Sequence, residues 1–342
     1  MVCITEVVSL DTPAPRRYPR DIEVRRHAVN NGDGWLLDVR QYLGATPSVR
    51  RPVLLVPGYC MNTTPLVFHP GGEPIVEYLV NRGFEVWTAN LRGQGETRST
   101  GGDRNVGFEA LALVDLHAAI DAVRSRTTTG RERLDVIGCS LGGTFLYTYL
   151  AHYRDAPFGA VVGIGAPLVW AKPHPVLRAA LGAPGWLGRV RVKGTRAAAR
   201  RMLPIALRFP RLLSVYMNTE HVDLTEIDRL VQTVEDPIAR LNEQIARWVR
   251  SRDLTVGGVN VTEGVRASRV PILSILANRD GIVPPSAARS VREVTDGRAD
   301  VLEVGDEVTW YAHTDLFVGR TCHERVFAPL VEWLQTHSDS RP

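Results

Sequence analysis

The chain has little of what marks secreted, membrane-spanning or metal-binding proteins. Its four cysteines are scattered and form no C-x-x-C or Cys/His ligand spacing, so we expect neither a disulfide framework nor a metal site. No run approaches the roughly 18 apolar residues that span a bilayer. Residues 1–10 lack a basic start and a long apolar core, and we expect no secretory signal. Together these absences predict a cytoplasmic protein.

Lysine is almost missing as well. Lys172 and Lys193 are the only lysines, all other cations are arginine, and the formal net charge is only +4. The positive charge is unevenly placed, because residues 171–211 hold ten Lys or Arg residues and no acid. Basic stretches can bind nucleic acid, but no recognition element or aromatic-interleaved patch accompanies this one. We therefore expect no nucleic-acid partner.

The hydrophobic pattern predicts an α/β protein. Strand-like stretches over 24–29 and 35–43 flank Asn30-Asn-Gly-Asp-Gly34, which is a strong hairpin signal. Strand and helix patterns then alternate, which predicts a mostly parallel sheet with helices on both faces. The predicted strands follow at 52–57, 84–89, 134–137, 158–164, 270–276 and 299–304, with helices at 73–82, 108–124, 144–151, 286–295 and 326–336.

About a hundred residues interrupt this alternation and predict a helical cap. We assign 1–23 to an N-terminal arm, 24–167 and 266–342 to the core, and 168–265 to the cap. Apolar residues at helical spacing predict one amphipathic helix from Ile227 to Trp248, kinked at Pro237. The basic, apolar character of the cap has two interpretations. Arginines can be solvated outside a leucine-rich layer, or the cap can contact anionic lipid surfaces or acidic ligands.

A G-x-S-x-G motif stands at the centre of the chain. The apolar strand 134–137 precedes Gly138-Cys-Ser140-Leu-Gly142, and a helical pattern follows. In this strand–turn–helix context, small flanking residues allow a tight turn that exposes the serine hydroxyl as a nucleophile. The alternative is a glycine-rich turn that merely contains a serine. The helix start supplies free N–H groups, so the Leu141 amide is a candidate oxyanion donor.

A serine nucleophile needs a histidine base held by a carboxylate. Asp280 follows the predicted strand 270–276, and His313 follows the next one, so Ser140, Asp280 and His313 occur in the order typical of this elbow. Asp280 precedes glycine and could simply form a turn. Asp315 is the rival acid, two residues beyond the histidine.

The second oxyanion donor should come from the loop after strand 52–57. Tyr59, after Gly58, is the first choice and Cys60 the second; the alternative is an ordinary Pro-Gly turn that ends the strand. The candidates for the substrate pocket are Cys60, His69, Trp170 and Asp315.

At this point the residues resemble the α/β-hydrolase superfamily, over about 25–338. The matching features are Val-Pro-Gly-Tyr59, Asn90-Leu-Arg-Gly-Gln-Gly95, Gly-Cys-Ser140-Leu-Gly-Gly, Asn-Arg-Asp280-Gly-Ile-Val-Pro and Ala-His313-Thr-Asp-Leu-Phe. The resemblance implies an eight-stranded sheet, a cap after the sixth strand, and Ser–Asp–His catalysis without a cofactor.

Two branches of the superfamily look similar. The stretch from Gly83 to Gly93 resembles acid lipases, and Gly257-Gly-Val-Asn-Val with the Asp280 loop resembles polyhydroxyalkanoate synthases. Those synthases carry cysteine at the elbow apex, whereas here Cys139 lies one position early and serine occupies the apex. Dehalogenases and epoxide hydrolases would carry aspartate there. The apex serine therefore favours hydrolysis.

The sequence predicts a serine hydrolase that cleaves a small-molecule carboxylic ester, with an apolar acyl chain, through an acyl-enzyme. Peripheral contact with membranes or lipids through the basic cap is a further expectation. Two alternatives stay open. The same triad could serve an acyltransferase or thioesterase, or the fold could bind a small apolar ligand without catalysis.

Overall fold

The computed structural model describes residues 22–170 and 192–338. Nearly all of the predicted arm and residues 171–191 of the predicted cap lie outside the described residues. The main sheet has nine strands, with β1, β2, β4, β3, β6, β7, β10 and β11 in spatial order and the short β5 paired to β2. Its strands are β1 (Glu23–Asn30), β2 (Trp35–Leu43), β3 (Val53–Val56), β4 (Val86–Asn90), β5 (Arg98–Ser99), β6 (Leu134–Cys139), β7 (Phe158–Ile164), β10 (Ile272–Ala277) and β11 (Asp300–Val304).

The sheet opens as an antiparallel hairpin and continues as a parallel sheet. β2 pairs antiparallel with β1 and β4, and the pairs from β4 to β11 are parallel. In the hairpin, Gly32 and Gly34 have φ of 75° and 74°, which glycine adopts readily. The mostly parallel sheet of the prediction is thus confirmed, and the two-residue β5 adds a ninth strand to the eight expected.

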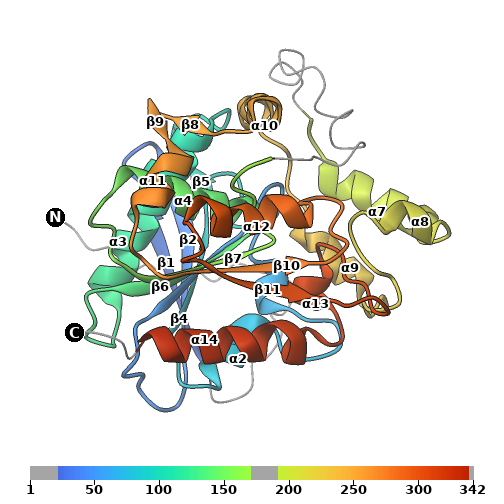
Figure 1. Ribbon diagram of the computed structural model, residues 1–342, viewed down its shortest axis with the longest axis horizontal. Coiled ribbons are helices and arrows are strands. Elements are labelled where there is room, and N and C mark those ends of the chain that lie inside the picture. The colour runs from blue at the N-terminus through green and yellow to red at the C-terminus, as the bar shows by residue number, and fades with distance from the viewer. Residues whose placement is uncertain (1–21, 171–191, 339–342) are drawn as a thin grey trace.

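Helices cover both faces of the sheet (Figure 1). Helices α2 (Ile75–Val80) and α14 (Ala328–Ser338) pack on one face, while α3 (Leu116–Arg126), α4 (Leu141–His152) and α12 (Pro285–Val294) pack on the other. Every residue of β3, β4, β6 and β10 is buried. Burial on both faces explains why these strands are continuous apolar runs rather than alternating patterns.

Two of the predicted helices begin with π-helical stretches. Ala110–Asp115 precedes α3, and His323–Phe327 precedes α14. A further short helix, α1 (Thr64–Val67), lies between β3 and α2, and α13 (Asp315–Val318) follows β11. Among the described residues, no helix has the length and apolar character that a membrane span requires.

The insertion between β7 and β10 contains several short helices. They are α7 (Thr195–Ala206), α8 (Pro210–Leu213), α9 (Ile227–Leu230), the 3₁₀ turn Val231–Thr233, and α10 (Ala239–Ser251). The prediction of one kinked helix from Ile227 to Trp248 is wrong, because the chain becomes extended at Val234. The Glu235 amide donates to the Cys60 carbonyl at 2.8 Å, and Pro237 disfavours helical geometry in the residue before it.

The end of the insertion lies directly on the core. Residues 255–260 form a small hairpin of β8 (Thr255–Val256) and β9 (Val259–Asn260), followed by α11 (Val261–Ala267). A Cβ atom at Gly264 would overlap the backbone of Ala151 in α4. Glycine therefore permits the close approach of α11 to α4.

Candidate active site

Ser140 occupies a sharp turn between β6 and α4. Its backbone has φ 53° and ψ −124°, a region that residues with a Cβ rarely adopt, and its amide donates to the Ile164 carbonyl at 2.7 Å. Gly138 and Gly142 make this turn sterically feasible. A Cβ atom at Gly138 would overlap the Gly143 amide, and one at Gly142 would overlap the Val56 carbonyl.

Asp280 and His313 form a buried pair. Asp280 Oδ2 lies 2.5 Å from His313 Nδ1, and the two residues are 4% and 7% exposed. The other carboxylate oxygen, Oδ1, accepts the backbone amides of Ile282 and Val283, both at 2.8 Å. Because a carboxylate accepts, the imidazole donates from Nδ1, which leaves Nε2 as a base in the neutral ring.

The turn after β7 supports both the serine and the acid–base pair. Gly165 has φ 59°, and a Cβ atom there would lie 2.9 Å from His313 Cε1 and 3.7 Å from Asp280 Oδ2. The preceding residue, Ile164, is the one whose carbonyl holds the Ser140 amide. The structure thus places Ser140, Asp280 and His313 around one short stretch of backbone at the carboxyl edge of the sheet.

Residues of the insertion between β7 and β10 are bonded to the loops that carry Asp280 and His313. The Gly281 amide donates to the Val215 carbonyl at 3.1 Å, and the Thr314 amide donates to the Tyr216 carbonyl at 3.0 Å. The Tyr216 ring lies 6.5 Å from the His313 ring between centroids. The segment after α8 therefore covers the pair and limits its contact with water.

The loop after β3 runs against the serine turn. A Cβ atom at Gly58 would lie 2.5 Å from the Cys139 carbonyl oxygen, 2.9 Å from Ser140 Cβ and 3.2 Å from the Leu141 amide nitrogen. Within residues 22–170 and 192–338, the amides of Tyr59 and Leu141 donate no hydrogen bond. Two unpaired N–H groups beside a serine hydroxyl are what a developing oxyanion requires.

Sequence comparison shows the family of the chain. The sequence model of the family described as serine aminopeptidase, S33, matches residues 48–306, more than half of the chain. The chain belongs to this α/β-hydrolase family. No curated protein sequence matches this hydrolase.

Solved structures with the same fold have diverse activities. The chain is similar to a 2-hydroxy-6-oxo-6-phenylhexa-2,4-dienoate hydrolase from Rhodococcus sp. strain RHA1, with 13% identity, 92% of this chain and 99% of that chain covered, and a TM-score of 0.62. It is also similar to an enol-lactonase from Burkholderia xenovorans LB400, with 15% identity, coverage of 91% and 100%, and a TM-score of 0.58. A third similar structure is a bromoperoxidase from Bacillus anthracis, with 14% identity, 91% of this chain and 100% of that chain covered, and a TM-score of 0.62. At such identities, the likeness concerns the fold.

Gln94 contacts the candidate oxyanion loop, and the sequence pattern did not single it out. Its Nε2 donates to the Gly58 carbonyl at 3.1 Å, and its Oε1 accepts the Leu91 amide at 2.8 Å. The Gly58 carbonyl and the Tyr59 amide belong to one planar peptide unit, so this contact fixes the direction of the Tyr59 N–H. The sequence signal for this residue is the motif from Asn90 to Gly95, which by itself indicates no role for any one of its residues.

A buried ion pair holds the same loop. Arg92 and Asp115 are fully buried, and Arg92 Nη2 lies 2.7 Å from Asp115 Oδ1. Asp115 also accepts the Arg92 backbone amide at 2.9 Å and Asn31 Nδ2 at 2.6 Å. Removing Arg92 would leave the charge of Asp115 buried and unpaired, and would thereby disturb the loop.

A hollow lies beside the Gly58–Tyr59 backbone. One side of its wall is formed by apolar side chains from the core and from the insertion between β7 and β10, and the other side is polar. The lining residues are Gly58, Tyr59, Cys60, Arg92, Gly93, Gln94, Leu111, Phe145, Glu235, Asp236, Ile238 and Leu241. The hollow therefore joins the candidate oxyanion loop to an apolar surface.

The candidate pocket residues fall in different places. Cys60 lines the hollow, and burial raises the pKa of its thiol to about 12, so the thiol is protonated at neutral pH. Trp170 is buried edge-on against Trp248, with ring centroids 5.6 Å apart, in the core cluster. Asp315 is fully buried, and burial raises its pKa to about 7 although the Ala312 and Asn218 amides donate to it. It thus holds backbone rather than the histidine.

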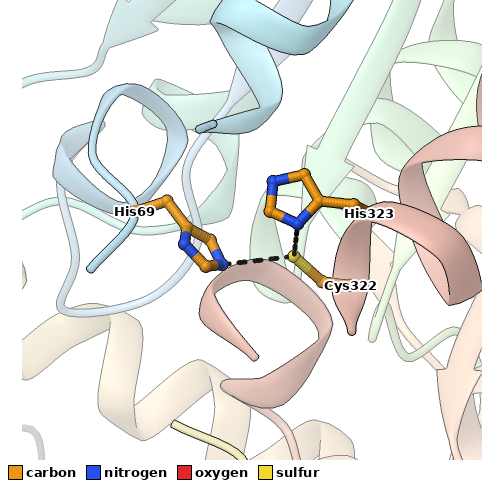
Figure 2. Close-up of side chains that lie close together, drawn as sticks. All are labelled: His69, Cys322 and His323. Carbon is orange, nitrogen blue, oxygen red and sulfur yellow. Dashed lines mark hydrogen bonds between the residues drawn. The ribbon is translucent and has the colours of Figure 1, made fainter. Parts of the chain in front are cut away.

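His69 lies outside the hollow and beside Cys322 and His323 (Figure 2). The Gly71 amide donates to His69 Nδ1, so the proton is on Nε2, which faces the Gly319 carbonyl at 3.2 Å and Cys322 Sγ at 3.4 Å. His323 Nε2 lies 2.7 Å from the Glu73 carbonyl, which leaves Nδ1 as an acceptor toward the thiol. A metal on His69 Nε2 would have to displace that proton, so the cluster fits a hydrogen-bonded chain between loops better than a metal site.

Proposed function

We propose that this α/β-hydrolase is a serine esterase that cleaves a carboxylic ester with an apolar acyl chain through an acyl-enzyme. Ser140 attacks the carbonyl carbon, and His313 Nε2 takes the hydroxyl proton. Asp280 keeps the imidazole in the tautomer with Nδ1–H. The observation that carries the proposal is the buried 2.5 Å contact between Asp280 and His313 next to a serine in a strained elbow.

In the next step, the backbone amides of Tyr59 and Leu141 stabilise the tetrahedral intermediate. As the carbonyl becomes tetrahedral, its oxygen gains charge, and the Tyr59 and Leu141 N–H groups stabilise that charge. His313 then passes the proton to the leaving alcohol, which leaves an acyl group on Ser140. A water activated by the same histidine releases the acid and restores the serine.

The apolar side of the hollow supports the acyl preference. Leu111, Phe145, Ile238 and Leu241 line it beside the Gly58–Tyr59 backbone. The hollow itself is small, about 20 Å³, so a longer acyl chain would extend past it along apolar side chains, where each CH₂ removed from water gains up to about 0.8 kcal/mol. We expect kcat/KM to increase with acyl length over a panel of p-nitrophenyl esters. A steady decrease of kcat/KM from acetate to longer chains would contradict the acyl preference.

The serine mechanism has a separate test. We expect Ser140→Ala to lower ester hydrolysis by about 10³-fold or more, with an unchanged melting temperature. Cys139→Ser is the matched control, because Cys139 is buried one position before the turn and carries no role in the mechanism. Full activity in Ser140→Ala would remove the mechanism.

A second candidate, aminopeptidase activity, follows from the carboxylates in the same hollow. Glu235 and Asp236 could hold a substrate ammonium group there. However, Glu235 already accepts from Arg196 at 2.7 Å and Asn62 at 2.6 Å, and Asp236 accepts the Thr195 amide at 2.8 Å. The Arg196 guanidinium thus already offsets the charge of Glu235, which favours the ester. Turnover of aminoacyl p-nitroanilides faster than of esters would reverse that preference.

A further inference from the structure

One side of α7 carries apolar and basic side chains with nothing described packed against it. We define the outer face of α7 as Arg201, Met202, Ile205, Arg208 and Phe209. Met202, Ile205 and Phe209 are 59%, 50% and 55% exposed, which is unusual for side chains of this size. Helical spacing places Arg201, Met202 and Ile205 on one side of α7. Arg208 and Phe209 follow the helix in a turn, where their amides donate to the carbonyls of Ile205 and Ala206, and Phe209 leaves helical geometry with φ −126°.

The opposite side of α7 fixes its orientation. Arg196 donates to Glu235 Oε1 at 2.7 Å and to the Val234 carbonyl at 2.9 Å. The Thr195 amide donates to Asp236 Oδ1 at 2.8 Å. Figure 1 shows α7 and α8 projecting beyond the layers of the core, and no residue of α7 is buried. The outer face is therefore held away from the rest of the described residues.

The charge around this face has one sign. Residues 192–211 contain no acid, and within the described part of the chain Arg201, Arg208 and Arg211 form no ion pair. By contrast, Arg200, on another side of α7, pairs with Asp228 at 3.1 Å. An isologous contact between two copies would bring these arginines together without acids, which argues against a dimer through this face.

We propose that the outer face of α7 docks on the surface of an anionic phospholipid bilayer. Met202, Ile205 and Phe209 enter the boundary between headgroups and acyl chains, and the flanking arginines bind lipid phosphates. Both contributions are needed, because three apolar side chains alone bury little surface. The α8 segment continues to Tyr216, whose carbonyl holds the Thr314 amide next to His313, so docking brings the candidate active site close to the membrane.

Co-sedimentation of the full chain with vesicles tests the docking without measuring activity. We expect binding to phosphatidylcholine vesicles with about 30 mol% phosphatidylglycerol to be at least tenfold stronger than to pure phosphatidylcholine. Raising the salt from about 0.05 to 0.5 M should lower the binding, since the Debye length becomes short. Equal affinity for both vesicles, or no binding to either, would overturn the proposal.

Two variants separate the apolar from the electrostatic contribution. We expect Met202→Ser/Ile205→Ser/Phe209→Ser to lose about tenfold or more in binding at all salt concentrations. Arg201→Gln/Arg208→Gln/Arg211→Gln should lose a similar factor and most of the salt dependence. Both should keep the wild-type melting temperature.

A control removes the same charge elsewhere. Arg133, Arg154 and Arg269 are exposed residues outside the cap, and Arg133→Gln/Arg154→Gln/Arg269→Gln should bind like the wild type. If this control loses as much binding as Arg201→Gln/Arg208→Gln/Arg211→Gln, the attraction to anionic lipid comes from the net charge of the whole protein and not from the outer face. If sedimentation velocity shows a dimer that Met202→Ser/Ile205→Ser/Phe209→Ser abolishes, the outer face is a contact between two copies of the chain. Either result contradicts the proposal.

Discussion

The carboxyl edge of the sheet and the outer face of α7 are organised in opposite ways. At the edge, Ser140, Asp280 and His313 are buried, and backbone amides and carbonyls fix the turns that carry them. On the outer face, the largest apolar side chains are half exposed or more. The side chains at the edge have partners among the described residues, whereas in our proposal the apolar side chains of the outer face gain theirs from a lipid bilayer.

Because of this difference, we expect substitutions in the two regions to affect different properties of the protein. Small changes at the edge should affect the chemistry because backbone hydrogen bonds fix the positions of the reacting groups there. Changes on the outer face should affect association and leave the fold intact. A large effect on stability from substitutions on the outer face, or a small effect on activity from substitutions at the edge, would contradict this contrast.

The largest effect is expected for Asp280→Asn. The amide can present its NH₂ group to His313 Nδ1, which favours the tautomer with the proton on Nε2 and removes the base. We expect kcat to fall by about 10³ to 10⁴-fold with little change in KM. Asp121→Asn, on the exposed side of α3, is the control and should keep wild-type kinetics. More than a tenth of the activity in Asp280→Asn would contradict the assigned role.

A smaller effect is expected for Gln94→Glu. The carboxylate can still accept the Leu91 amide but cannot donate to the Gly58 carbonyl, so the Tyr59 N–H loses its fixed direction. We expect kcat to fall by about 10 to 100-fold with KM and melting temperature nearly unchanged. Affinity for a boronic acid that mimics the tetrahedral state should fall in parallel. Gln335→Glu, on α14, is the matched control; a rise in KM alone would refute the positioning role.

Asp315 predicts a pH dependence of stability. Its pKa is raised from 3.8 to about 7 by burial, so between these values the folded state binds more protons than the unfolded state. The free energy of unfolding therefore falls as pH rises through this window, by up to about 1.4 kcal/mol per pH unit from this group. Denaturation with urea at pH 4 to 8 should show a weaker decline in Asp315→Asn. An equal decline in both proteins would contradict this account.

The smallest effect is expected for the stability of the variant with three serine substitutions on the outer face of α7. Met202→Ser/Ile205→Ser/Phe209→Ser removes side chains that are already half exposed or more, so each substitution should change the free energy of unfolding by no more than about 0.5 kcal/mol. Urea denaturation provides the measurement. A loss of several kcal/mol would show that the outer face packs on protein.

Most core elements could be predicted because the residues that determine each strand or turn lie close together in the sequence. The apolar runs of β3, β6 and β10, and the small residues Gly138 and Gly142, are visible within a few residues of sequence. Parallel strands end at one edge, so the order of Ser140, Asp280 and His313 was enough to expect them there. The structure places them at that edge.

Contacts between distant segments were not predictable in the same way. The hydrogen bond from Gln94 to Gly58 and the pairing of Glu235 with the Cys60 carbonyl depend on how separate loops meet. The second of these contacts lies in the stretch that interrupts the expected helix from Ile227 to Trp248. His69 was expected near the pocket from its place after the Pro57–Tyr59 loop, but its partners come from Gly319 and Cys322, about 250 residues away.

Labelling with a fluorophosphonate, followed by mass spectrometry of the peptides, tests the central claim most directly. The reagent phosphonylates a serine only when a base and oxyanion donors activate the hydroxyl. The account predicts one modified residue, Ser140, and loss of labelling in both Ser140→Ala and His313→Ala. An unlabelled folded protein, or modification at another serine, would contradict it.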